Sequence, residues 1–210
     1  MMATTHAFVG AALAGVTLLV APAAAPAAMA AGFVGGIVPD LDVAFDHRRT
    51  FHFPIFGSVL AAALVLVAVL VPSTATIAVA AFVVAAALHP VMDHLGGSRE
   101  ARPWLRTTDR AVYDHYGRRW LPARRWIGYD GSPADFGLGV LASLPVLAFA
   151  DGHLWNVAVA SLLVSAGYTV FRRRVFDVWD ALVAALPPAV LAVLPRAPDS
   201  VRSDESERDR

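Results

Sequence analysis

Histidines and aspartates lie at the edges of long apolar segments in the first half of this 210-residue chain. Ionisable groups at membrane depth are costly, so membrane proteins usually keep them for binding sites or conduction pathways. Imidazole and carboxylate groups are also a ligand set that divalent zinc, iron and manganese accept. The pattern therefore predicts a divalent metal site. The core set of candidate residues is His6, Asp40, Asp42, His47, His52, His89 and Asp93.

One candidate ligand pair is His89 and Asp93, which are four residues apart at the end of an apolar run. Residues four apart share one face of a helix, so both side chains can reach one ion. Gly96 and Gly97 follow and are expected to end the helix. The alternative is that His89 and Asp93 only hydrogen-bond to each other at a helix terminus.

Asp40 and Asp42 form a second pair, separated by one residue. One of them could cap a helix N-terminus, which is the usual role of an aspartate in such a position. Two carboxylates this close together at a membrane boundary would repel each other unless a cation or Arg48 lay between them. The pair therefore favours a bound cation, and the helix cap is the alternative.

His47 and His52 flank an arginine pair and are five residues apart. On a regular helix this spacing places the two histidines on diverging faces, so we expect a loop that ligates through one or both. The guanidinium fork of Arg48 suits a phosphate oxyanion, whereas Arg49 is expected to anchor the loop to anionic headgroups. We predict catalytic roles for Arg48 and His47 and a ligand role for His52.

The composition indicates a membrane protein. The chain is 57% hydrophobic and 16% charged, and its mean hydropathy is +0.58, whereas soluble domains carry about 25% charged residues. We expect an all-α, polytopic integral membrane protein with about six to seven transmembrane or membrane-embedded helices. The net charge of zero names no partner beyond the lipid bilayer, and no nucleic-acid binding is predicted. The absence of cysteine excludes thiolate ligands.

The first apolar stretch, from about residue 7 to 38, allows three interpretations. It could be a secretory signal peptide, a single long helix, or a hairpin of two short helices near 5–20 and 24–38. Residues 1–5 contain no basic residue, which counts against a signal peptide. Because Pro22 and Pro26 interrupt the middle of the stretch, we favour the hairpin. A hairpin returns the chain to its starting side and so brings the candidate ligands at its two ends to one membrane face.

The rest of the chain divides into further apolar runs and polar links. The runs at about 55–71 and 74–88 are separated by a proline-containing turn and predict a second helix hairpin. Three more apolar runs lie at about 136–150, 154–170 and 178–194. The expected units are membrane-embedded hairpins with the metal site (1–97), an arginine- and aromatic-rich interfacial segment (98–135), C-terminal transmembrane helices (136–195) and a disordered charged tail (196–210).

The interfacial segment combines eight arginines with three tryptophans and three tyrosines. This mixture suits a helix that lies along the lipid headgroups, and a solvated loop with ordinary aromatic packing fits it equally well. Of the 17 arginines, 13 fall in the links 39–54, 93–135 and 171–177. By the positive-inside rule these links mark the cytoplasmic face of the cell membrane, and the predicted metal site lies on that face.

The motifs, taken in chain order, resemble those of a known family. Four motifs are similar to motifs of the YdjM-like family: Thr5-His6, Pro39-Asp40-Leu41-Asp42, His47-Arg48 followed by His52, and His89 followed by Asp93 at the end of an apolar helix. This family is described as LexA-binding, inner-membrane-associated, metal-dependent hydrolases, and the resemblance covers residues 4–97. Val43, Arg49 and Phe53 stand where the family commonly has histidine, glycine and serine. The family is distantly similar to zinc-dependent phospholipases C and P1-type nucleases, which implies phosphodiester chemistry.

Residues and resemblance together predict a membrane-bound metal-dependent hydrolase. The resemblance narrows the expected ligands of the ion, for which zinc is the first choice, to His6, Asp40, Asp42, His52, His89 and Asp93. A metal-activated water would attack a phosphodiester or lipid-like substrate at the cytoplasmic interface, and Arg48 would stabilise the developing charge. One alternative is a non-catalytic membrane protein that binds or transports metal ions. The ionisable groups gather at one edge of the predicted helices and not along their middles, which counts against a conduction path. Another is a membrane anchor whose histidines and aspartates satisfy one another.

Overall fold

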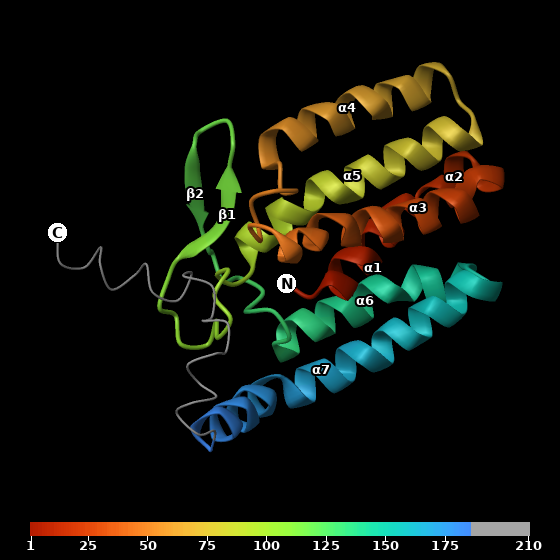
Figure 1. The fold of residues 1–210 in the computed structure, drawn as a ribbon. Coiled ribbons are helices and arrows are strands. Elements are labelled where there is room, and N and C mark those ends of the chain that lie inside the picture. Colours follow the sequence, from red (N-terminus) through yellow and green to blue (C-terminus); the bar gives the residue numbers. More distant parts are fainter. Residues whose placement is uncertain (186–210) are drawn as a thin grey trace.

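The computed structural model describes residues 1–185 as a bundle of helices with a small two-stranded sheet at one end (Figure 1). The α-helices are α1 (Ala3–Ala14), α2 (Thr17–Val20), α3 (Ala25–Ile37), α4 (Pro54–Leu70), α5 (Thr74–Leu95), α6 (Pro133–Phe149) and α7 (Gly152–Ala184). Two 3-10 helices, η1 (Pro22–Ala24) and η2 (Val38–Ala44), flank α3. The strands are β1 (Arg110–Asp114) and β2 (Arg119–Pro122).

Four helical stretches of the described chain are long and apolar enough to cross a membrane. They are Ala3–Val20, Pro22–Ala44, Thr74–Leu95 and Gly152–Trp179, and α4 and α6 are shorter apolar helices. The prediction of a mostly helical protein whose helices are compatible with a membrane is therefore confirmed. The individual spans and their sidedness stay predictions.

The first hairpin is confirmed, because α1 and α3 pack against each other on either side of a turn that contains Pro22. Their backbones approach so closely that a Cβ added to Gly32 would collide with the carbonyl oxygen of Gly10. Without a hydrophobic driving force between helices in lipid, small residues permit this close van der Waals packing. The helix α1 lies centrally and also contacts α5, α6 and α7, with Phe8 among its fully buried side chains.

The second hairpin is also confirmed. Helices α4 and α5 pack side by side, and Ser73 and Thr76 form a reciprocal capping box at the start of α5. The helix α5 continues through Pro90 and ends before Gly96, so its last two turns carry His89 and Asp93. The predicted shared helix face of this pair is therefore present.

The segment 98–135 contains a β-hairpin. One of the two predictions for this segment was a helix along the headgroups, and that prediction is wrong. The prediction of a strictly all-α fold is wrong for the same reason. Strands β1 and β2 pair antiparallel, with Tyr113 opposite Trp120 and a register shift near Arg110. The two facing rings lie edge-on with centroids 5.5 Å apart, which is a favourable cross-strand aromatic pair. The backbone N–H of Tyr113 donates to the carbonyl of Arg48 (3.0 Å), so the hairpin holds the loop that follows η2.

Residues 171–177 were predicted to form a link between two helices. They are helical, so the predicted link is wrong. Helix α7 runs unbroken from Gly152 to Ala184 because no proline or glycine interrupts it after Gly167. The arginines of the predicted link point back to the loops: Arg172 donates to the carbonyl oxygens of Asp130 (2.9 Å) and Ala101 (3.2 Å). Most of the predicted run 178–194 and the tail 196–210 lie outside the described residues.

The close contact of α1 and α3 yields a prediction on stability. Replacing Gly32 by alanine puts a methyl group against the backbone of Gly10, which cannot move aside as a flexible side chain could. We expect Gly32→Ala to lower the unfolding free energy by about 1–3 kcal/mol, measured by thermal unfolding in detergent micelles. The matched control is Gly137→Ala in α6, where nothing lies within 4 Å of the added methyl. Equal stability of the two variants would contradict the prediction.

Candidate metal centre

Four side chains converge at the end of the bundle that carries the β-hairpin. Asp40 from η2, His52 from the following loop, and His89 and Asp93 from α5 each offer one ligand atom, and these atoms all lie within 4.8 Å of one another. His52, His89 and Asp93 are fully buried, whereas Asp40 is partly exposed. The four residues could hold a metal ion.

The ring of His89 is oriented by the backbone of α3. Its Nδ1 lies 2.7 Å from the carbonyl oxygen of Gly36, and because a carbonyl can only accept, Nδ1 carries the proton. Nε2 therefore faces the centre, 3.2 Å from Asp40 Oδ1 and 3.4 Å from Asp93 Oδ2, and in the neutral ring it presents a lone pair there. A hydrogen bond on the far nitrogen is the usual way in which proteins fix a metal-binding histidine.

Asp42 orients His52 and is not one of the converging groups, which corrects its assignment as a ligand. Its Oδ2 accepts from Nδ1 of His52 (2.8 Å) and its Oδ1 from Nδ1 of His47 (2.9 Å). The same carboxylate accepts from the backbone N–H groups of Arg48, Arg49 and Phe51, each at 3.2 Å. Asp42 thus closes the loop around itself and leaves His52 Nε2 facing Asp93 Oδ2 at 3.4 Å.

The two oxygens of Asp93 have different surroundings. Oδ1 contacts three nitrogens: the amine of Met1 (2.6 Å), Nε2 of His6 (3.2 Å) and Nη2 of Arg48 (3.4 Å). Burial lowers the pKa of the Met1 amine, but the negative charges of Asp93, Asp135 and Asp130 together outweigh it and the pKa is raised. Oδ2 is left to face the two histidines.

Three buried atoms at the centre have no hydrogen-bond partner within residues 1–185. They are Nε2 of His52, Nε2 of His89 and Oδ2 of Asp93. Buried polar atoms almost always have a partner, so each exception calls for an explanation. Here the exceptions point at one another and are all electron-pair donors, which is the arrangement that a cation satisfies.

His6 lies beside the four converging residues without being one of them. Its ring stacks on that of His89, with centroids 3.6 Å apart, and its Nδ1 has no partner among the described residues. Of the six predicted ligands, four therefore converge, His6 flanks them and Asp42 lies behind His52. The hairpin of α1 and α3 does bring His6 and Asp40 to the same end of the bundle, as predicted.

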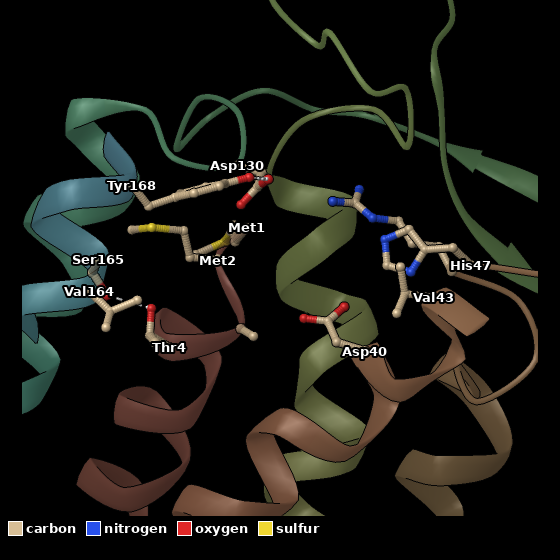
Figure 2. Close-up of a pocket in the computed structure, with 12 residues that line it drawn as sticks. Met1, Met2, Thr4, Asp40, Val43, His47, Asp130, Val164, Ser165 and Tyr168 are labelled. Carbon is tan, nitrogen blue, oxygen red and sulfur yellow. Dashed lines mark hydrogen bonds between the residues drawn. The ribbon is translucent and has the colours of Figure 1, made fainter. Parts of the chain in front are cut away.

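Arg48 and His47, the two predicted catalytic residues, line a cavity beside the centre. Arg48 is buried, has a left-handed backbone (φ 62°), and donates from Nη1 to the carbonyl of Gly97 (2.7 Å). His47 is partly exposed and held by Asp42. The cavity has a volume of about 360 Å³ and is also bordered by Asp40, so it reaches the centre (Figure 2).

Sequence reasoning missed the far wall of this cavity. Asp130 and, on α7, Val164, Ser165 and Tyr168 line it, and the hydroxyl of Tyr168 donates to Asp130 (2.7 Å). On α1, Thr4 hydrogen-bonds to Ser165 at 2.7 Å. Nothing in the local sequence predicts a role for these residues, because only tertiary packing brings them to the cavity beside the centre.

Comparison with known proteins identifies no relative of this chain. No family model, no curated protein and no solved structure matches the chain. The resemblance to the YdjM-like family therefore stays a prediction from the motifs, and the chemistry of the centre is argued from its own atoms.

The convergence of ligand atoms predicts the outcome of a metal analysis. The variant His89→Ala/Asp93→Ala removes two of the four converging groups, so we expect its metal content, measured by plasma mass spectrometry after purification, to fall to background. The control is His153→Ala, at the start of α7 and at the opposite end of the bundle (Figure 1). Unchanged metal content in the double variant would refute the metal centre.

The position of Asp42 predicts a graded effect. In Asp42→Asn the side chain keeps its shape but loses its charge and one acceptor oxygen, so His52 is held less firmly. We expect the affinity for the ion to fall about 10–100-fold, measured by competition with a chelator of known affinity. Asp46→Asn is the matched control, since Asp46 is partly exposed and pairs instead with Arg49 and Arg99. Equal affinities in the two variants would show that Asp42 does not support the centre.

Proposed function

We propose that the protein is a membrane-bound metal-dependent hydrolase that acts on phosphodiesters. The observation that carries the proposal is the asymmetry of the centre. The side chains of His52, His89 and Asp93 are at most 1% exposed, whereas that of Asp40 is 19% exposed and borders the cavity. Structural zinc sites are closed by protein ligands, whereas catalytic sites keep a position accessible to water and substrate.

Zinc is the ion that we propose. Two imidazoles and two carboxylates offer only nitrogen and oxygen, which suits zinc, and iron and manganese accept the same groups. The buried part of the centre is small and fixed by hydrogen bonds to Asp42 and Gly36. A compact, preorganised set of four ligands suits zinc, which can expand to five-coordinate when water or substrate binds.

The bound ion would supply a water that is deprotonated near neutral pH. Hydrolysis would join the oxygen of a water to phosphorus and break the bond between phosphorus and the leaving alcohol, which gives a phosphomonoester and an alcohol. His47 donates its Nδ1 proton to Asp42, so its Nε2 can accept the proton of the water and pass it to the leaving oxygen. Arg48, at the cavity wall, stabilises the negative charge on the phosphate.

We further propose that the centre lies on the cytoplasmic side of the cell membrane. The 13 arginines among residues 1–185 fall in three groups: the loop after η2, the segment between α5 and α6, and positions 172–174 of α7. Figure 1 shows the first two at the end of the bundle that carries the β-hairpin, and Arg172 hydrogen-bonds to Ala101 within the second. An end this rich in arginine is expected to face the cytoplasm.

Turnover by a His47 variant tests the proposal. His47 is not among the converging ligands, so His47→Ala should keep its metal while its kcat falls by a factor of about 100 to 10,000. The substrates are bis(p-nitrophenyl) phosphate and phosphatidylglycerol in nanodiscs, and His153→Ala serves as the control. Metal binding without turnover of either substrate by the unaltered protein would favour the alternative, a non-catalytic metal-binding membrane protein.

A further inference from the structure

The cavity beside the centre has two chemically different walls. One wall, from η2 and the loop after it, presents Asp40, His47 and Arg48. The opposite wall, from α1 and α7, includes Ala3 and Val164. Figure 2 shows Asp40 and His47 on one side and Val164, Ser165 and Tyr168 on the other. A molecule that satisfies both walls has an anionic end and an apolar end.

The mouth of the cavity is rimmed by aliphatic side chains. Val43 is 73% exposed and Val164 is 67% exposed, and Figure 2 places them on opposite sides of the cavity. Val164 lies within the candidate membrane span Gly152–Trp179, of which only 11% is buried in the protein. This surface of α7 would therefore face hydrocarbon, and the mouth opens toward lipid at the level of Val164.

The other charged group of the cavity is already neutralised. Asp130 accepts from the hydroxyl of Tyr168 and pairs with Arg172 at 3.1 Å. The hydrogen bond between Thr4 and Ser165 ties α1 to α7, so these two helices form one continuous wall of the cavity. With a cation bound by Asp40 and its neighbours, the charge of the ion attracts an anion. Arg48 already pairs with Asp93, but its Nε has no partner among the described residues and can donate to that anion.

We infer that this cavity admits a membrane lipid with a phosphate headgroup, which enters sideways from the bilayer between η2 and α7. The phosphate lies between Arg48 and the centre, and the acyl chain leaves past Val43 and Val164 into the hydrocarbon. The inference rests on the metal centre of the proposed function and names its substrate class, a phospholipid and not a soluble phosphodiester. A volume of about 360 Å³ holds a headgroup and the first part of a chain while the rest stays in the bilayer.

Photolabelling tests the inference without requiring turnover. The zinc-loaded protein is placed in phosphatidylcholine nanodiscs with hexadecylphosphonate that carries a photoreactive diazirine near its headgroup, and the labelled residues are mapped by mass spectrometry. We expect the label to concentrate on Met2, Val43 and Val164, which line the cavity. Excess unlabelled hexadecylphosphonate should compete with this labelling, and methylphosphonate should compete far less because it lacks the chain.

A pair of adjacent variants provides the control. Val164→Trp fills the mouth and should lower the labelling of Met2 about tenfold. Leu163→Trp adds the same group one residue away, at a position that is 69% exposed and outside the cavity lining, and should leave it unchanged. Metal content verifies that both variants are folded. Labelling spread evenly over the lipid-facing side of α7, or equal labelling in both variants, would overturn the inference. Concentrated labelling without hydrolysis would refute the proposed reaction alone.

Discussion

The geometry of the centre depends on one constraint: three buried electron-pair donors face one another in a space that hydrogen bonds within residues 1–185 do not fill. Nε2 of His52, Nε2 of His89 and Oδ2 of Asp93 would repel if nothing positive lay between them. The surrounding contacts enforce this arrangement, because Asp42 and the Gly36 carbonyl hold the protons of the two rings on their far sides. A bound cation would attract all three atoms and so make the same arrangement stabilising.

Helix packing and the orientation of the ligands are coupled through small residues. A Cβ on Gly36 would collide with the backbone of His6, so this glycine is required for α3 to approach α1. The carbonyl of the same residue accepts from His89. The close approach also stacks His6 on His89. Tight backbone contacts through small residues permit close van der Waals packing of helices, and here they also fix the centre.

The centre is dry on one side and open on the other, and this division follows from the elements that build it. Helix α5 and the loop around Asp42 bury three of the four groups, whereas Asp40 stands on η2 at the edge of the bundle. The cavity next to Asp40 is completed by α7, a helix that is mostly not buried by the protein. The centre therefore lies at the junction of a polar loop and a helix with a largely exposed apolar surface.

The sequence by itself determined what depends on neighbouring residues: the four-residue spacing of His89 and Asp93, the proline turns of the two hairpins, and the apolar composition. Only the tertiary structure decided the role of Asp42, because a carboxylate becomes ligand or support according to which loop atoms reach it. The strands near Tyr113 and the cavity wall on α7 were likewise decided by packing. The physical reason is that residue spacing specifies which side chains share one face of a helix. Contacts between distant segments specify which residues that face packs against.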